Sequence, residues 1–268
     1  MDEKNKEILI VDDEDIIIDA VKKILSSEGY RVKGANDVKI ALNKLEKQSF
    51  DMIICDIMMP EVDGFQFIDL LNEKGFQVPL IMTTGFSTVE NAVKSLYSGA
   101  IDFIPKPFTA DELLSSVIRG FRFVDLQDRI TQQSGKRNSE LIYVPCPTTY
   151  YRLGYSVWAS VEKAGSALIG VTDMFIKTIA EAENIILQEE ESELIQGVTG
   201  IQFESGENII HNVISPLSGR IIESNKDLTN DLKLLEKDPY FKGWIYRMIP
   251  SDLDYELKHL IPCSSDRL

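Results

Sequence analysis

Residues 53–64 read I-I-C-D-I-M-M-P-E-V-D-G, an apolar run that stops at an aspartate and is followed by Met-Met-Pro. The run is short and rich in isoleucine, which is typical of a buried strand. Asp56 then stands at the end of that strand. Taken alone, Asp56 could equally be a turn residue before the proline, so its meaning depends on what the rest of the chain places beside it.

The chain around this run alternates short apolar segments with amphipathic ones as far as about residue 125. In the amphipathic segments apolar residues recur at helical spacing, as at Ile17, Val21 and Ile24. The expected strands span residues 8–11, 30–33, 52–55, 79–82 and 102–104, and the expected helices span 14–28, 36–48, 64–74, 87–97 and 109–125. Five repeats of strand then helix predict a doubly wound α/β fold of flavodoxin-like type, with five parallel strands and helices on both faces. Sheets of this kind bind ligands outside the carboxyl ends of their strands.

Polar side chains stand at that edge after four of the expected strands. The set comprises Asp12 and Asp13 after the first strand, Asp56 at the end of the third, Thr84 at the end of the fourth and Lys106 after the fifth. Three carboxylates in a small space repel one another and need a cation, and oxygen ligands with room for water suit Mg²⁺. A lysine and a hydroxyl beside them can hold the oxygens of a transferred phosphoryl group.

Each of these residues also has a simpler interpretation when it is considered singly. The acids at 12–14 could form the N-cap and first turn of a helix, Lys106 could be an exposed side chain, and Phe103 could be an ordinary core residue. Their co-occurrence at strand ends favours the shared site instead.

These motifs, in order and spacing over about residues 5–125, resemble the receiver domain of two-component response regulators. The resemblance implies that Asp56 accepts phosphate from the phosphohistidine of a histidine kinase. It also implies roles for the neighbours of Asp56: Asp12 and Asp13 as Mg²⁺ ligands together with Asp56 and the backbone carbonyl of Met58, and Thr84, Lys106 and Phe103 as the phosphoryl-contact and switch residues.

The resemblance further implies a switching mechanism. In such domains the Lys106–Pro107 peptide bond is cis, a form that an X–Pro bond can adopt. The new phosphate is expected to draw Thr84 inward, after which Phe103 fills the vacated space. That movement would bias a two-state equilibrium on the face formed by the fourth helix, fifth strand and fifth helix, with homodimerisation through the fifth helix as one outcome.

The second half of the chain has a different character. Residues 126–140 are polar and carry Ser-Gly at 134–135, so they are interpreted as a linker, although the last helix can run on into them. Beyond them strand-like segments predominate, at 141–144, 149–161, 167–171, 198–204, 209–214, 217–223 and 244–249, with one helical stretch at about 174–183. The second half is therefore predicted to be mainly β.

Short motifs of this half resemble the H protein of the glycine cleavage system, which has a lipoyl-like barrel-sandwich β fold. The resemblance covers about residues 150–254. It lies in I-G-V-T-D at 169–173, S-P-L-S-G at 215–219, D-P-Y at 238–240, G-W at 243–244 and P-S-D at 250–252.

The H-protein family presents a lysine on the hairpin that precedes S-P-L-S-G, and the lysine amine carries lipoate. Here the corresponding position falls on Asn208, or on Glu207 if the alignment shifts by one residue. Neither side chain can form the amide, and no lysine occurs between Lys177 and Lys226. No lipoate is therefore expected.

The composition of the chain narrows the classes of function that remain. The chain of 268 residues carries 28 basic and 43 acidic residues, a formal charge of −15, and both halves are acidic. Binding to nucleic acid or to an anionic membrane surface is therefore not expected. The first residues, M-D-E-K-N-K-E, are charged and no apolar run approaches membrane-spanning length, which predicts a cytoplasmic protein. The three cysteines and two histidines match no disulfide or zinc pattern.

The leading hypothesis is a response regulator with a receiver domain at 1–125, a linker at 126–140, an H-protein-like domain at 141–262 and a tail at 263–268. Phosphorylation of Asp56 would gate protein–protein interaction of a non-lipoylated output domain with a downstream protein. No enzymatic output is expected beyond the receiver's own phosphotransfer and dephosphorylation.

Three rival hypotheses are weighed against it. One is a phosphorylation-regulated carrier of lipoyl or H-protein type, with its group attached at another residue. A DNA-binding regulator is disfavoured by the acidic second half, and an enzyme by the lack of a nucleophile–base pair or metal set in residues 141–268.

Overall fold

The computed structural model describes residues 5–85, 89–133, 142–179, 181–206 and 209–267. Contacts between residues separate the chain into two compact units, one made of residues 1–88 and 98–121 and the other of 89–97 and 122–268. Among the described residues, no helix is both long enough and apolar enough to cross a membrane.

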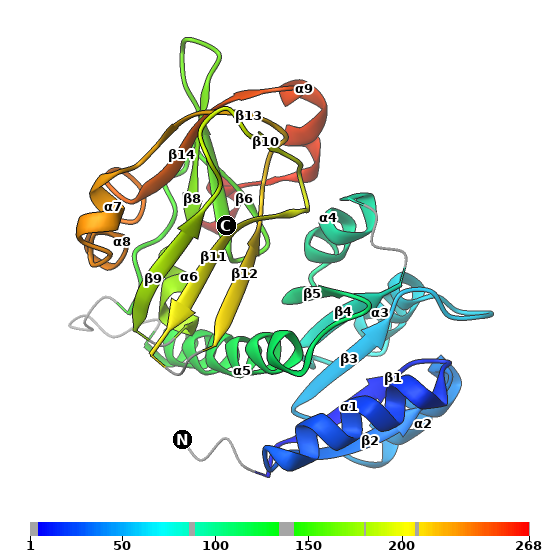
Figure 1. Cartoon of the computed structure of the whole chain (residues 1–268). Helices are drawn as coiled ribbons and strands as arrows, with labels where there is room; N and C mark the ends of the chain where they lie inside the picture. The colour runs from blue at the N-terminus through cyan, green and yellow to red at the C-terminus, as the bar shows by residue number, and fades with distance from the viewer. Residues whose placement is uncertain (1–4, 86–88, 134–141, 180, 207–208, 268) are drawn as a thin grey trace. The chain divides into compact units, whose positions relative to one another are not determined.

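The first unit contains a five-stranded parallel sheet in the order β2-β1-β3-β4-β5 (Figure 1). Its strands are β1 (Glu7–Val11), β2 (Arg31–Ala35), β3 (Met52–Asp56), β4 (Leu80–Thr84) and β5 (Asp102–Pro105). They alternate along the chain with α1 (Asp15–Ser27), α2 (Val38–Lys47), α3 (Gly64–Glu73), α4 (Val89–Tyr97) and α5 (Ala110–Gln133). The predicted doubly wound, flavodoxin-like fold is confirmed, and the strand order reverses between β1 and β3.

Helices cover both faces of this sheet because its central strands are apolar on both sides. On one face, α2 and α3 bury Ala41, Leu45 and Phe67 against β1, β3 and β4. On the other, α5 lies so close to β3 that a Cβ added to Gly120 would stand 2.6 Å from Cε of Met52. Polar side chains gather at the sheet edge that bears the carboxyl ends of the strands, with Asp12, Asp56 and Thr84 buried there.

Two helix boundaries affect the site and the linker. A capping box starts α3, because the Asp63 carboxylate accepts from the backbone N–H of Gln66 (2.8 Å) while the Gln66 side chain accepts from that of Asp63 (2.9 Å). This fixes the end of the loop that follows β3. At the other extreme, α5 runs to Gln133, so the first part of the expected linker is helical; Leu126 is buried there.

The second unit is mainly β, as predicted. One sheet has seven strands in the order β10-β13-β14-β8-β7-β6-β15, and the other has three in the order β12-β11-β9. The larger sheet contains β6 (Tyr151–Leu153), β7 (Val157–Val161), β8 (Ala167–Val171), β10 (Glu193–Leu194), β13 (Gly219–Ser224), β14 (Trp244–Pro250) and β15 (Ile261–Pro262). The smaller contains β9 (Ala182–Leu187), β11 (Thr199–Ser205) and β12 (Ile210–Ile214). Short helices are α6 (Asp173–Thr178), α7 (Asp227–Asn230), α8 (Leu234–Lys237), α9 (Leu253–Glu256), η1 (Leu257–His259) and η2 (Cys263–Arg267).

Several predicted boundaries in this half were wrong. Residues 142–144 form no strand, and the single strand expected at 149–161 is two, β6 and β7, separated by a turn with Gly154 at φ 57°. The helix expected at 174–183 ends at Thr178, and residues 182–187 form β9 instead. Pairing with β11 decides this, since Ile185 lies opposite Phe203 in the smaller sheet.

The short motifs of the second half hold its strands together. Gly170 lies under the indole of Trp158, where a Cβ would stand 2.6 Å from a ring carbon, and Trp158 donates to the carbonyl of Val171 at 2.9 Å. The Asn225 side chain donates to the carbonyls of Lys242 and Trp244 at 2.8 and 2.7 Å. These residues therefore serve the fold of the second unit.

Candidate functional site

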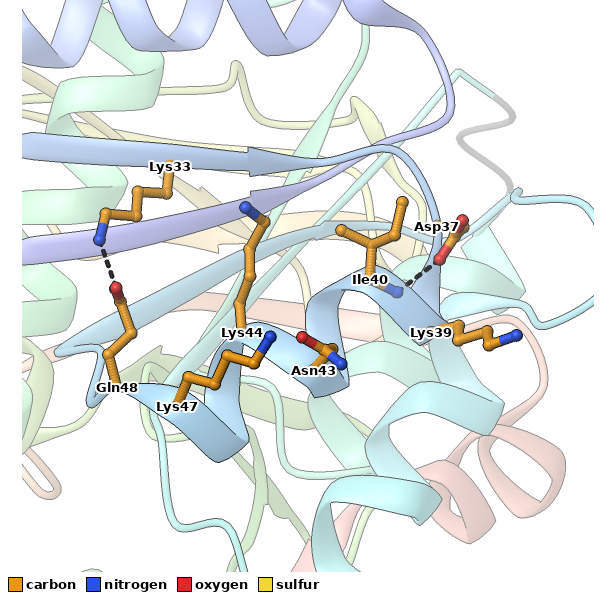
Figure 2. A pocket seen from close by; sticks show the side chains of 8 residues that line it. All are labelled: Lys33, Asp37, Lys39, Ile40, Asn43, Lys44, Lys47 and Gln48. Atoms are coloured by element: carbon orange, nitrogen blue, oxygen red, sulfur yellow. Dashed lines mark hydrogen bonds between the residues drawn. The ribbon is translucent and has the colours of Figure 1, made fainter.

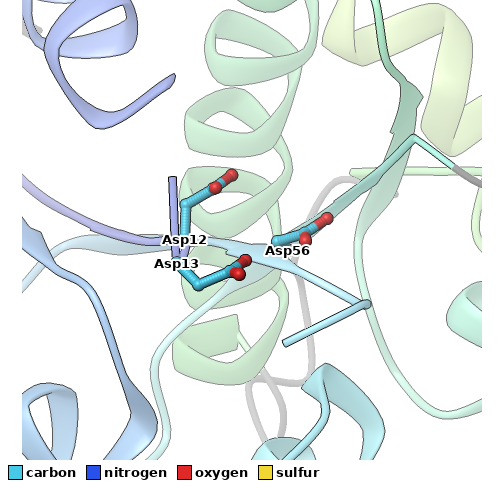
Figure 3. A group of neighbouring side chains, drawn as sticks. All are labelled: Asp12, Asp13 and Asp56. Carbon is cyan, nitrogen blue, oxygen red and sulfur yellow. The ribbon is translucent and has the colours of Figure 1, made fainter. Parts of the chain in front are cut away.

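The carboxyl edge of the parallel sheet brings together the acids selected from the sequence. Asp12 directly follows β1 and Asp56 ends β3, which is the neighbouring strand, so both face the same edge. One carboxylate oxygen from each of Asp12, Asp13 and Asp56 lies within 4.8 Å of the other two. Figure 3 shows the three side chains gathered at the ends of these strands.

Lys106 completes the cluster from the loop after β5. Its Nζ lies 2.6 Å from Oδ2 of Asp12 and 3.3 Å from Oδ1 of Asp56. All three side chains are buried or nearly so, with 10% of the Lys106 side chain exposed. Asp12 also accepts from the backbone N–H of Glu14 at 3.0 Å, whereas the Glu14 side chain makes no capping bond to α1. Asp12 thus faces the lysine as well as the start of the helix.

Burial and charge shift the pKa values in this cluster. Burial raises the pKa of Asp56, and the carboxylate of Asp12 adds to that shift, while the Lys106 ammonium opposes it. Burial alone would lower the pKa of Lys106, but the hydrogen bond and charge of Asp12, with the charge of Asp56, outweigh it and raise that pKa. The lysine is therefore held as a cation beside carboxylates that repel one another.

The remaining predicted residues lie around this cluster. Thr84 is fully buried at the end of β4, and its carbonyl accepts from the backbone N–H of Lys106 at 2.8 Å. The Lys106–Pro107 bond is cis. Phe103 is half-buried on β5 and packs against the core beneath α2 and α3. Met58 lies two residues past β3 with its side chain 51% exposed.

Two features of the site were not selected from the sequence. Thr83 lies opposite Asp56 in the β3–β4 register, and its buried Oγ1 has no hydrogen-bond partner within the described part of the chain. Arg119 on α5 is only 4% exposed and forms an ion pair with Asp102, the residue before Phe103. In sequence Arg119 belongs to an amphipathic helix and gives no local signal of burial, because its partner is on another element.

The donor set suits a hard divalent cation. The three carboxylates offer only oxygen ligands, and buried Oδ1 of Asp56 has the Lys106 ammonium 3.3 Å away but no well-aligned hydrogen bond from a described residue. Asp13 is exposed, which leaves a side open for water. This combination fits Mg²⁺, held by Asp12, Asp13 and Asp56.

The hairpin of the second unit is described up to its tip. β11 and β12 pair with Glu204 opposite Ile210, and the backbone N–H of Ser205 donates to the carbonyl of Ile209 at 3.1 Å. Asn208 and Glu207, the positions assigned to the missing lysine, lie outside the described residues. The S-P-L-S-G segment that follows is anchored by Glu256, whose carboxylate accepts from the N–H of Ser218 at 2.8 Å.

A doubly wound sheet with three carboxylates and a lysine at its carboxyl edge is the arrangement expected of a receiver domain. In agreement, residues 8–118 match the family model of the response regulator receiver domain. Residues 149–264 match the family model of the glycine cleavage H-protein. Receiver domains are phosphorylated by histidine kinases and generally use Mg²⁺ at such an acidic site.

The curated relatives are response regulators that share the first part of the chain. The response regulator protein TmoT of Ectopseudomonas mendocina is 34% identical over 117 residues, which are 44% of this chain and 53% of that protein. The transcriptional regulatory protein ZraR of Klebsiella oxytoca is 36% identical over 107 residues, 40% of this chain and 24% of that protein. The chain therefore spans about half or less of the length of these two relatives.

A solved receiver domain is also similar to part of this chain. The receiver domain of Francisella response regulator 1452 is 30% identical, with a TM-score of 0.43, and the match covers 45% of this chain and 99% of that one.

Proposed function

We propose that this protein is a two-component response regulator whose Asp56 accepts a phosphoryl group from a histidine kinase. The observation that carries the proposal is the convergence of Asp12, Asp13, Asp56 and Lys106 at one sheet edge. The match to receiver domains and the response regulator relatives support it.

The residues of this site have separate roles in the proposed reaction. A carboxylate oxygen of Asp56 attacks phosphorus, the bond from phosphorus to the kinase histidine nitrogen breaks, and an aspartyl phosphate forms. Lys106 holds a phosphoryl oxygen with its ammonium, and Thr84 donates its hydroxyl to another. Asp12 and Asp13, with the Met58 carbonyl, hold Mg²⁺, which when bound neutralises charge on the transferred group.

The output is proposed to be protein–protein interaction through the H-protein-like domain. The absence of lysine between Lys177 and Lys226 supports a domain that carries no lipoate. Movement of Thr84 and Phe103 would pass the signal to α4, β5 and α5, and homodimerisation through α5 is one route to the output domain. The proposed limits are a receiver at 1–125, a linker at 126–140, an output domain at 141–262 and a tail at 263–268.

Phosphorylation can be tested with a small acyl phosphate as donor and Mg²⁺. We expect the intact mass to rise by one phosphoryl group in the wild type and not in Asp56→Asn. Asp69→Asn is the matched control, since Asp69 is exposed on α3 away from the cluster and this variant should label normally. A folded wild-type protein that stays unlabelled would overturn the proposed function.

A second mass measurement distinguishes the carrier alternative from a non-lipoylated output domain. The full chain is produced together with a lipoylating enzyme and free lipoate, and its mass is compared with that of an authentic H protein treated in the same way. We expect the authentic H protein to gain lipoate and this chain to keep its unmodified mass. A lipoylated product would show that the second unit is a carrier.

A further inference from the structure

A basic hollow lies beside α2 of the first unit, away from the carboxylate cluster. Its volume is about 770 Å³, and it lies between Lys33, in the middle of β2, and the length of the helix. Its walls are Lys33, Asp37, Lys39, Ile40, Asn43, Lys44, Lys47 and Gln48, and Figure 2 shows the lysines distributed along it. Four lysines on one hollow are notable in a chain whose formal charge is −15.

Three of these lysines form no ion pair with any described residue, although the hollow is also lined by Asp37, whose carboxylate caps α2. Lys33 donates to Gln48 and lies 3.9 Å from the carboxylate of Glu7. Lys39, Lys44 and Lys47, by contrast, form no ion pair with any acid in the described part of the chain. Lys39 and Lys47 lie two helical turns apart on α2 with the neutral Asn43 between them, and Lys44 follows Asn43, so positive charge recurs along the helix from Lys39 to Lys47.

A second hollow of about 320 Å³ adjoins the first, since Lys39 and Asn43 line both. Its lining includes the apolar residues Val38, Leu42, Val62 and Leu70, together with Glu46, and comes from α2, α3 and the loop before α3. Lys74 at its rim is already paired with Glu46 at 3.2 Å. Together the two hollows offer a basic stripe next to an apolar seat, which matches a segment of protein chain that carries acids beside an aliphatic residue.

The chain itself contains such a segment in the second unit. Residues 188–193 read Q-E-E-E-S-E, and all four glutamates are exposed, three on the turn between β9 and β10 and Glu193 at the start of β10. Glu190 and Glu191 form exposed ion pairs with Lys226 and Arg220, whereas Glu189 and Glu193 pair with no base in the described part of the chain. Two aliphatic residues close behind this turn are also exposed, Ile195 by 51% and Val198 by 46%. We name residues 189–198 the acidic turn, and residues 39–47 with the two hollows the lysine groove.

We propose that the lysine groove of one copy of this protein binds the acidic turn of a second copy. The glutamates would face Lys39, Lys44 and Lys47, and Ile195 would enter the apolar seat. A small anion would use only part of a stripe that runs most of the length of α2, and the net charge of the chain opposes nucleic acid. Lys44 and Lys47 also interact favourably with the negative C-terminal end of the α2 dipole. That interaction explains these two lysines without a partner, but it does not explain Lys39 or the adjoining apolar seat.

Sedimentation velocity over a range of protein concentrations tests the contact through charge reversal. The groove variant replaces Lys39, Lys44 and Lys47 with glutamate. We expect self-association of the wild type to weaken about tenfold in this variant, because three exposed ion pairs become repulsive. Association should also weaken as salt rises, since the pairs are solvent-exposed.

The turn variant replaces Glu189, Glu190 and Glu193 with lysine. This variant is less acidic overall than the wild type, so general repulsion between copies is smaller. The proposal nevertheless predicts weaker association, because its turn now meets the lysines of the groove. Stronger association of the turn variant would overturn the proposal.

Sedimentation of a mixture of the groove variant and the turn variant is the decisive measurement. Each variant alone should be largely monomeric, whereas an equimolar mixture should associate about as well as the wild type, since a reversed groove meets a reversed turn. The control variant replaces Lys163, Lys233 and Lys242, which are exposed and outside the groove, with glutamate, so its charge change equals that of the groove variant. Adding the turn variant to this control should not increase association. A wild-type chain that stays monomeric, or a mixture that fails to associate, refutes the contact, and circular dichroism verifies that each variant is folded.

Discussion

At the scale of single residues, the site depends on one cation placed among three carboxylates. Lys106 contacts Asp12 and Asp56 although it is 94 positions from Asp12 in the chain. Asp12 has no exposed surface, so water cannot screen its charge. The side chain that is proposed to hold a phosphoryl oxygen therefore also stabilises the resting fold.

Replacing Lys106 with methionine should expose that dual role. In the absence of Mg²⁺ we expect the unfolding free energy to fall by about 2 kcal/mol, because a buried carboxylate loses its partner. Added Mg²⁺ should stabilise the variant more than the wild type, since the ion supplies the missing positive charge. Scanning calorimetry with and without Mg²⁺ measures both effects. Lys163→Met, at an exposed position, is the control and should change stability by less than about 0.5 kcal/mol.

At the scale of elements, the two halves differ in how far local sequence determines their strands. The strands of the first unit were predicted to within two residues at each end, helped by β1, β3 and β4, which are short apolar runs buried on both faces. In the second unit, β9 was missed because Ala-Glu-Asn-Ile-Ile-Leu has no clear period, and its pairing with β11 decides its conformation. Likewise, the strand predicted at 149–161 is divided by the turn at Gly154, because its two parts pair with each other as β6 and β7.

The close approach of β13 to β14 can be tested at Gly219, the first residue of β13. Gly219 has φ 150°, and a Cβ there would stand 2.1 Å from the carbonyl oxygen of Ile249 on β14. We expect Gly219→Ala to lower the unfolding free energy of this unit by about 3 kcal/mol, since the neighbour is backbone and cannot rotate away. Both tryptophans, Trp158 and Trp244, lie in the second unit, so tryptophan fluorescence during urea unfolding reports on it.

The matched control for that substitution is Gly165→Ala. Gly165 also has positive φ, 86°, but a Cβ added there has no atom within 4 Å. Its expected cost is the backbone strain alone, about 1 kcal/mol. Equal losses for the two variants would show that the approach of β13 to β14 does not limit stability.

At the scale of the whole molecule, buried polar groups tie separate sheets together and make stability depend on pH. Tyr246 on β14 is fully buried, donates to the carbonyl of Gly200 on β11 at 3.1 Å and accepts from the N–H of Gln188 at 2.6 Å. Burial raises the pKa of Tyr246 to about 12, with the Gln188 N–H partly opposing the shift. Burial likewise raises the pKa of Tyr240.

A raised phenol pKa makes the folded state lose stability in alkali. The contribution of Tyr246 is complete below its unfolded pKa of about 10 and is lost as the pH rises through about 12, a total of about 2–3 kcal/mol. Urea unfolding followed by tryptophan fluorescence at about pH 8 and pH 11 should show this decline. Tyr246→Phe should be less stable at the lower pH but should decline less, with Tyr240 supplying the remaining dependence. An unchanged decline in the variant would contradict the assignment.

By itself the sequence determined the two fold classes, the strand ends that bear Asp12, Asp56 and Thr84, and the lack of a lysine before S-P-L-S-G. These follow from local patterns, since periodicity and turn residues act over a few positions of the chain. Only the tertiary structure decided that Lys106 pairs with both Asp12 and Asp56, that Arg119 is buried against Asp102, and that the lysines of α2 line a hollow. The ion pairs join residues from different elements and become buried only when the sheet has assembled and excluded water, and the hollow forms only where α2 packs beside β2.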